Sequence, residues 1–146
     1  MTTSYETDVV AWANEQAQLL RAGRFDLLDI ENIAEEIEDV GKAEQRELRS
    51  RMAALLVHLL KWQYQPERRS ESWRLIATIR RKAFLRALES VPSQKAQLVD
   101  EEWWGRVWDD ALIKAIDETD LADFPDTCPW TFAEIMDDDW LPEEGL

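Results

Sequence analysis

The chain has 146 residues, which is enough for one domain with a hydrophobic core and too few for two domains of ordinary size. Apolar residues make up 45% and charged residues 33%, as in folded proteins rather than disordered chains. Acidic residues outnumber basic ones by 31 to 17, and the net charge of −14 excludes a protein held to nucleic-acid phosphates by overall charge. Four glycines and five prolines are too few turn-forming residues for a β-sandwich.

The sequence also predicts a cytoplasmic protein. Its single cysteine, Cys128, excludes an intrachain disulfide and a cysteine-based zinc site. The first residues carry neither the basic nor the apolar stretch of a secretory signal. The longest nearly apolar run, residues 52–60, is far shorter than the roughly 20 residues of a membrane span. We therefore expect neither export nor insertion into a membrane.

Charge is distributed unevenly along the chain. Residues 61–86 hold eight basic and two acidic residues, whereas residues 100–146 hold two basic and sixteen acidic ones. Residues 1–60 are also acidic, with six basic and twelve acidic residues. A basic middle between acidic flanks favours pairing of charges between antiparallel helices; the alternative is that the basic stretch binds an external anion.

Two helices are expected in the first half of the chain. Thr7 or Asp8 is expected to cap a helix that ends near residue 20. Asp29 is expected to cap a second helix that continues without a break to Tyr64, because its apolar residues keep one phase throughout. At 100° per residue these residues fall on one arc: Ile30, Ile33, Ala34, Ile37, Val40, Leu48, Met52, Leu55, Leu59 and Trp62.

A glycine interrupts this arc, and a third helix follows the second. Gly41 lies on the arc itself, where it indicates a kink or a close crossing with another helix. The long helix is expected to end before Pro66. The third helix is expected to begin at Ser70 or Ser72 and to end near Ser90.

The last part of the chain predicts a long helix and a short one. The long helix is expected to begin after Ser93 and to end near residue 118. Thr131 and Glu134 form a capping box for the short helix. With no convincing strand, the sequence predicts an all-α helical bundle built around one long helix with antiparallel neighbours. We expect a single domain with an irregular acidic C-terminal segment at residues 120–146.

Eight tryptophans are many for a chain of this length, and most lie at core-facing helical positions. Trp130 and Trp140 are exceptions, because they lie in the irregular C-terminal segment. We expect them to pin this segment to the bundle; the alternative is that they are available to a partner.

The only histidine, His58, is a candidate metal ligand together with Glu31, Glu35, Glu36 and Glu38 of the same helix. Di-metal helical bundles use a Glu-x-x-His pair on each of two helices, and this chain has one histidine. The axial rise of a straight helix also separates His58 from Glu38 by more than about 25 Å. We therefore expect no metal and no cofactor, and a histidine satisfied by one hydrogen bond at the margin of the core.

Two charged residues lie on helix faces whose other residues are mostly apolar. Glu44 lies on the arc of the long helix and Arg80 on the apolar side of the third helix. Because a buried charge needs a partner, the sequence predicts an ion pair between Arg80 and either Glu38 or Glu44, largely out of water. The alternative is an anion site around Arg80.

A stretch of arginines and a tryptophan opens the third helix. Arg68, Arg69 and Arg74 lie close in sequence to Trp73, a combination of guanidinium groups and an aromatic ring that can hold a phosphate or a base. No recognised nucleic-acid-binding motif surrounds it, so nucleic-acid binding is not favoured.

Three long segments carry a resemblance to a known family: YETDVVAWANEQAQLLRAGRFDLLDIENIAEEIEDVG, HLLKWQYQPERRSESWRLIATIRR and CPWTFAEIMDDDWLPE. They resemble the bacterial family described as domain of unknown function twenty-nine, in order and from Tyr5 to about residue 143. The resemblance implies a compact, all-helical cytoplasmic protein without an assigned activity, and it offers no catalytic residue to carry over.

The sequence favours a non-catalytic protein-interaction or adaptor module, with a protein partner or a second copy of the chain as its binding partner. One alternative is a small metal-binding protein or enzyme that uses His58 and acidic residues. Another is an anion or nucleic-acid binder that uses the basic region at residues 68–86.

Overall fold

The structure is a computed structural model, and it describes residues 4–142. These residues form helices joined by short connections and by one longer irregular stretch at residues 120–131, and no strand occurs among them. The all-α fold class is therefore confirmed. The chain divides into two compact units, Met1–Ala43 and Glu44–Leu146. We call them the N-terminal unit and the C-terminal unit.

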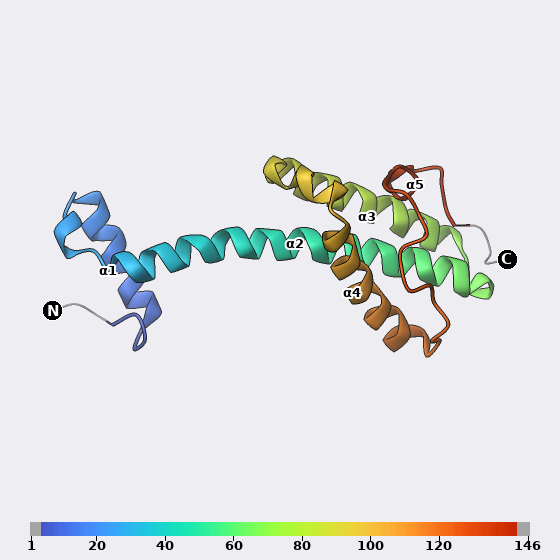
Figure 1. Ribbon diagram of the computed structural model, residues 1–146, viewed down its shortest axis with the longest axis horizontal. Helices are drawn as coiled ribbons and strands as arrows, with labels where there is room; N and C mark the ends of the chain where they lie inside the picture. The colour runs from blue at the N-terminus through green and yellow to red at the C-terminus, as the bar shows by residue number, and fades with distance from the viewer. Residues whose placement is uncertain (1–3, 143–146) are drawn as a thin grey trace. The chain divides into compact units, whose positions relative to one another are not determined.

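The N-terminal unit holds α1 (Val9–Arg21), a short 3₁₀ turn and the first part of α2 (Ile30–Tyr64), shown in blue to cyan in Figure 1. Asp8 caps α1, because its carboxylate accepts a hydrogen bond from the Ala11 amide at 3.1 Å. Gly23 follows the helix with a φ of 72°, a left-handed conformation that glycine adopts without strain and that reverses the chain toward α2.

Polar contacts fix the turn between α1 and α2. Trp12 and Gln16 are the buried residues of α1, and both bind Asp29. The Trp12 indole Nε1 donates to the Asp29 carboxylate at 2.9 Å, and the Asp29 amide donates to the Gln16 side chain at 2.9 Å. The Tyr5 hydroxyl donates to the Glu36 carboxylate of α2. The same Asp29 also accepts at its other side-chain oxygen from an amide in the first turn of α2, so it caps this helix as expected.

The long helix predicted from the apolar arc is confirmed. α2 is helical from Ile30 to Tyr64, and its helical backbone continues through Gly41. The close helix crossing expected at Gly41 is wrong, because a Cβ atom added there would meet no atom within 4 Å. Gly41 therefore lies on an open face of the helix.

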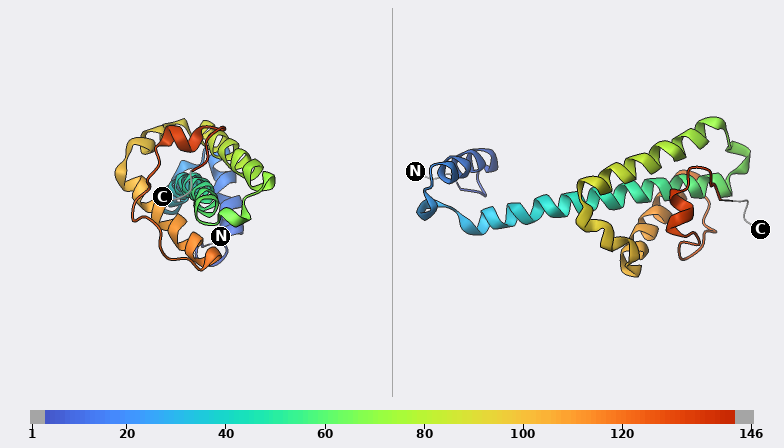
Figure 2. Two further views of the ribbon diagram at one scale, coloured as in Figure 1. Left: turned by 90° about the vertical axis from the view of Figure 1, so that its right-hand side faces the viewer. Right: turned by 90° about the horizontal axis from the view of Figure 1, so that it is seen from above.

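The C-terminal unit contains the rest of α2 and the elements that surround it: η2 (Pro66–Arg68), α3 (Glu71–Ser90), η3 (Pro92–Val99), α4 (Glu101–Thr119) and α5 (Phe132–Met136). Figures 1 and 2 show α3 and α4 on two sides of the second part of α2. Ser70 caps α3 by accepting from the Trp73 amide at 3.3 Å.

The start of α4 differs from the sequence-based expectation. Ser93 begins no α-helix: residues 92–99 form a 3₁₀ helix, which ends at Asp100 with an extended ψ of 114°. The Asp100 carboxylate accepts from the Glu102 amide at 3.0 Å, and α4 begins between them. The stretch expected to be one helix is therefore divided in two, because Asp100 is a second strong N-cap only seven residues after Ser93.

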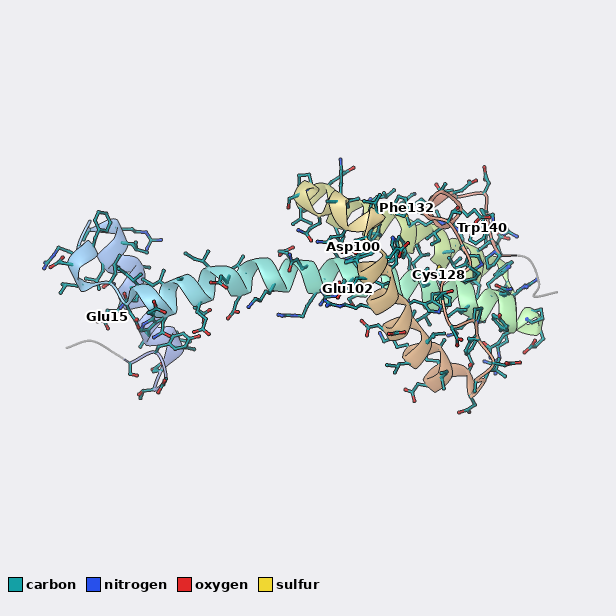
Figure 3. All side chains as sticks on the ribbon, viewed as in Figure 1. Glu15, Asp100, Glu102, Cys128, Phe132 and Trp140 are labelled. Carbon is teal, nitrogen blue, oxygen red and sulfur yellow. The ribbon has the colours of Figure 1, made fainter. Side chains whose placement is uncertain are left out.

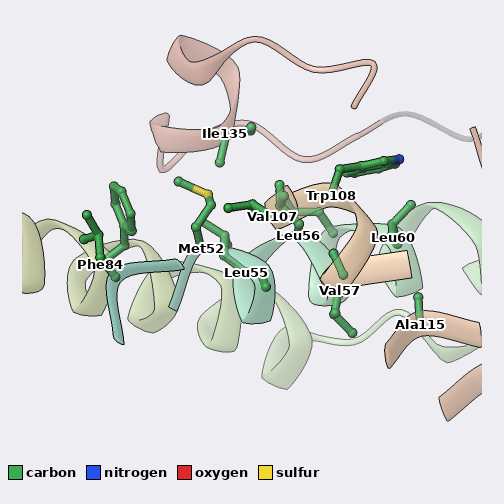
Figure 4. Packing of buried hydrophobic residues seen from close by; sticks show 14 of the residues in the cluster. Met52, Leu55, Leu56, Val57, Leu60, Phe84, Val107, Trp108, Ala115 and Ile135 are labelled. Carbon is green, nitrogen blue, oxygen red and sulfur yellow. The ribbon is translucent and has the colours of Figure 1, made fainter. Parts of the chain in front are cut away.

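Apolar side chains from every α-helix of the C-terminal unit form one core. Met52, Leu55 and Leu56 of α2 are fully buried at its centre, between Phe84 of α3 and Trp108 of α4 (Figure 4). Further fully buried members come from the same helices and from α5: Leu48, Leu59, Leu60, Val107, Ala111, Ala115 and Ile135.

The segment after α4 is held on this core by aromatic rings and by a capped helix. Trp130 lies edge-on to Trp108, with ring centroids 5.7 Å apart, and Trp140 lies edge-on to Trp130 at 5.8 Å. Figure 3 labels Trp140, Phe132 and Cys128 along this segment. The capping box is confirmed, since Thr131 and Glu134 bind each other's backbone amides. Trp130 and Trp140 therefore pin the described part of the segment to the bundle.

Candidate functional site

His58 lies within the C-terminal unit at the junction of α2 and α3. It is 6% exposed, and its Nε2 lies 2.6 Å from the Trp73 carbonyl oxygen. Burial lowers the pKa of His58, and the positive charges of Arg80, Lys61 and Arg81 lower it further, against the effect of the carbonyl. The ring is therefore neutral at neutral pH, and its Nε2–H donates to Trp73. Residues 4–142 contain no group of three or more histidine, cysteine or acidic side chains that could hold a metal ion.

The arginine-rich start of α3 is engaged within the fold. Arg69 and Arg74 both lie over the Trp62 ring, at 5.1 and 5.4 Å from its centroid. The Arg69 Nε also donates to the Trp62 carbonyl at 2.7 Å, which satisfies an acceptor at the C-terminal end of α2. Lys61 lies over the Trp73 ring at 5.6 Å, whereas Arg68 is exposed. These contacts join the end of α2 to the start of α3.

The predicted ion pair of Arg80 is wrong, because the side chain on the core side of α3 is Arg81. Arg80 is exposed, whereas Arg81 is 1% exposed. The Arg81 Nε donates to the Ile135 carbonyl and its Nη2 to the Trp140 carbonyl, each at 2.6 Å. Burial lowers the pKa of Arg81, and the nearby carboxylates of Asp138 and Asp137 oppose that effect. A buried arginine therefore fastens the C-terminal segment to α3 through carbonyl groups.

The register of α3 explains this correction. The buried positions are Ala77, Arg81, Phe84 and Leu88, at spacings of four, three and four residues. Ile79 is large and apolar and lies next to Arg80 in the sequence, yet it is 63% exposed. The small Ala77 belongs to this buried face. Its spacing from Phe84 and Leu88 is the sequence signal that places Arg81, and not Arg80, on the same side of the helix.

Glu38 and Glu44, the other two members of the predicted pair, are exposed residues of α2. They lie beside apolar side chains that are exposed as well: Ile30 is 66% exposed, and Ile37 and Val40 are each 67% exposed. The apolar arc is therefore buried where it meets the core of the C-terminal unit and largely exposed in the N-terminal unit, where only Ile33 of its four large members is half-buried.

These residues form a candidate interaction surface, which we call the acidic stripe. It consists of Ile30, Ile33, Ile37 and Val40, at heptad spacings of three, four and three residues, with Glu31 and Glu38 beside them. Residues 4–43 hold ten acidic and three basic side chains, so the stripe lies in a strongly negative unit.

A second exposed stripe runs along α3, and we call it the basic stripe. Leu75 is 56% exposed and Ile79 is 63% exposed, and Lys82 and Arg86 continue the same face at spacings of three and four residues. Neither Lys82 nor Arg86 forms an ion pair with a residue that the structure describes. This stripe could not be recognised from the sequence, because apolar residues such as Leu75 and Ile79 are ordinarily expected in the core of a helical bundle.

No helix within residues 4–142 combines the length and the apolar character that crossing a bilayer requires. No curated protein and no solved structure matches the chain. One family does: the sequence model described as "Domain of unknown function DUF29" matches residues 4–141. This match covers nearly the whole chain and agrees with the resemblance carried by the three sequence segments. The chain belongs to the DUF29 family.

Proposed function

We propose that this chain is a protein-interaction module that pairs with a second copy of itself, the acidic stripe of one copy binding the basic stripe of the other. The observation that supports this proposal is the presence, on one chain, of two stripes that expose apolar side chains and carry opposite charge. Contiguous apolar surface on a folded protein indicates an interaction site, because its exposure to water is unfavourable.

The two stripes match in length and in spacing. Ile30 to Val40 covers eleven residues and Leu75 to Arg86 covers twelve, which correspond to axial rises of about 15 and 16.5 Å. Both follow the alternation of three and four residues that lets the side chains of two helices interdigitate. A helix of one copy can therefore pack along a helix of the other.

Charge selects the pairing between unlike stripes. Two acidic stripes would bring Glu31 and Glu38 against the same residues of another copy, which is repulsive. The basic stripe presents Lys82 and Arg86 instead, so contact between unlike stripes joins opposite charges. Because each copy carries both stripes, either copy can supply the acidic stripe or the basic stripe of a contact.

Sedimentation equilibrium tests this assembly on the full-length protein. We expect a dimer whose dissociation constant rises with salt concentration, because the paired charges are exposed to solvent. Ile37→Asp places a charge in the acidic stripe and should give a monomer. The matched control is Ile113→Asp on α4, where the isoleucine is 68% exposed but lies outside both stripes; it should leave the dimer intact.

A charge exchange identifies the two surfaces directly. Glu31→Lys with Glu38→Lys should give a monomer, and so should Lys82→Glu with Arg86→Glu. An equimolar mixture of these two variants should form a dimer, because contact between their stripes again joins opposite charges. A wild-type protein that stays monomeric at every concentration would overturn the proposal. A dimer that survives both double variants would also overturn it. If Ile37 is instead needed for a complex with a different protein, that protein and not a second copy of the chain is the partner of the acidic stripe.

A further inference from the structure

A groove of about 680 Å³ lies in the C-terminal unit, between the first turns of α4 and the segment that leads into α5. Four aromatic side chains line it: Trp104 and Trp108 from α4, and Trp130 and Phe132 from the segment. Figure 3 shows Phe132 and Cys128, another lining residue, on the segment beside the bundle. The proposed pairing of stripes uses none of these residues.

Hydrogen bonds and ring contacts fix the aromatic rings. The Trp104 indole Nε1 donates to the Leu98 carbonyl at 2.7 Å, and the Trp108 indole Nε1 donates to the Pro125 carbonyl at 2.9 Å. Phe132 lies edge-on to Trp104 with centroids 6.1 Å apart. Trp108 is 1% exposed and forms the inner wall of the groove, whereas Trp104 and Trp130 are half-buried. Because its indole N–H group is already engaged, Trp104 offers a ligand its π surface rather than a hydrogen-bond donor.

The charged groups of the groove all have one sign. Glu101 and Asp109 come from α4 and Asp126 from the segment, and the groove has no lysine, arginine or histidine among its lining residues. All three are exposed acidic residues, and they make the opening of the groove negative. An anionic ligand is therefore excluded and a cationic one is attracted.

The ring surfaces define which cation fits. The face of an indole ring attracts a positive charge and also packs against apolar groups, so it favours an alkylammonium ion over a fully hydrated metal ion. The described residues place no three acidic, histidine or cysteine side chains together as metal ligands. We propose that the groove binds a small organic cation, an ammonium group with apolar substituents held between tryptophan faces and carboxylates.

Gly105 keeps part of the groove open. It lines the groove in the second turn of α4, and a Cβ atom added there would meet no atom within 4 Å. Its backbone is helical without a positive φ, so a larger residue fits the helix without backbone strain. Gly105→Leu therefore fills space in the groove while it favours the helix, which makes it a blocking variant that should still fold.

Isothermal titration calorimetry with choline and with phenyltrimethylammonium tests the proposal, and the tryptophan indole N–H signals in NMR spectra locate the site. We expect both cations to bind the wild-type protein and to shift the indole signals of the groove. Dimethylbutanol, the uncharged isostere of choline, should bind about tenfold more weakly or not at all. Gly105→Leu should abolish binding. Gly41→Leu is its matched control, a helical glycine with the same open surroundings outside the groove.

A pair of neighbouring carboxylates tests the contribution of charge. Asp109→Asn should weaken binding of choline several-fold, whereas Asp110→Asn should leave it unchanged, because Asp110 lies outside the groove. Both residues are exposed, so both variants should fold. Equal affinity for choline and its uncharged isostere, or full binding by folded Gly105→Leu protein, would overturn the proposal. Absence of binding by either cation to the wild-type protein would overturn it as well.

Discussion

The two units of this protein are stabilised in different ways. In the N-terminal unit, Trp12 and Gln16 are the only buried residues among residues 4–43, and both are hydrogen-bonded to Asp29. In the C-terminal unit, a continuous apolar core joins α2, α3, α4 and α5. Hydrogen bonds define the geometry of a small unit but contribute modest net free energy, whereas burial of apolar area supplies most of the free energy of folding.

α2 shows what this difference means for function. Its apolar arc keeps one phase from Ile30 to Trp62, yet Leu59 is fully buried and Ile37 is 67% exposed. The same pattern of residues therefore forms a core in one unit and an exposed face in the other. A regular apolar stripe does not by itself tell whether its partner lies in the same chain. For the stripe of the N-terminal unit, the partner that we propose is a second copy of the chain.

The largest expected contrast is between two truncations on this arc. Leu59→Ala should lower the free energy of unfolding by about 2–5 kcal/mol, because it opens a cavity in the core. Ile37→Ala should change it by less than about 0.5 kcal/mol in the monomer, because the side chain is exposed there. Urea unfolding, carried out at a protein concentration too low for dimer formation, measures both free energies of unfolding. Equal losses would show that Ile37 is buried within the monomer.

The next contrast concerns adjacent arginines of α3. Arg81→Met keeps most of the side-chain volume but leaves the Ile135 and Trp140 carbonyls without their donor, so it should cost about 3 kcal/mol. Arg80→Met should cost less than about 0.5 kcal/mol, because Arg80 is exposed. Thermal unfolding of the two variants provides the comparison, and a larger effect at position 80 would contradict the register described for α3.

Local signals in the sequence predicted most of the fold. The caps at Asp8, Asp29 and Ser70 and the capping box at Thr131 are each read from a few residues, and all are present. The unbroken phase of α2 was also sufficient to predict its length. These features are predictable because each depends on hydrogen bonds or periodicity within one segment.

The errors concern contacts between segments. Periodicity placed Arg80 on the core side, but Arg81 is buried because the α5 segment offers it two carbonyl acceptors. Backbone carbonyls have no signature in the sequence, so a search for an acidic partner could not find them. The groove was missed for the same reason, since Trp104 and Trp130 become neighbours of one cavity only when the segment folds back onto α4.

In the N-terminal unit, a smaller effect should depend on pH. Hydrogen bonds from the Asn32 side chain and from the Trp12 indole lower the pKa of Asp29 in the folded protein. Its contribution to stability is therefore present above the unfolded pKa of about 3.9 and is lost as the pH falls through the lower folded value. The Trp12 indole N–H signal in NMR should titrate with a midpoint below about 3.9, and Asp29→Asn should remove this step. A midpoint above that value would mean that the carboxylate lacks these donors.

The smallest expected effect is confined to Tyr5. The hydrogen bond that its hydroxyl donates to Glu36 raises the pKa of Tyr5 from 10.0 to about 12, and the negative charges of Glu36, Glu35 and Asp39 add to this effect. A raised pKa means that the protonated hydroxyl is favoured by folding, so this contribution persists below pH 10 and is lost as the pH rises through about 12.

Ultraviolet titration of the phenolate measures this shift once the other tyrosine is removed. In a Tyr64→Phe background, the single remaining tyrosine should ionise with a midpoint near pH 12. Adding Glu36→Gln removes the negative charge that accepts the hydrogen bond, so the midpoint should move toward 10.0. Glu38→Gln, a change of the same kind at an exposed position of α2, should leave it near pH 12. An unshifted midpoint in the Tyr64→Phe protein would show that the Tyr5–Glu36 contact does not form, and that the contacts of Trp12 and Gln16 with Asp29 hold α1 to its turn.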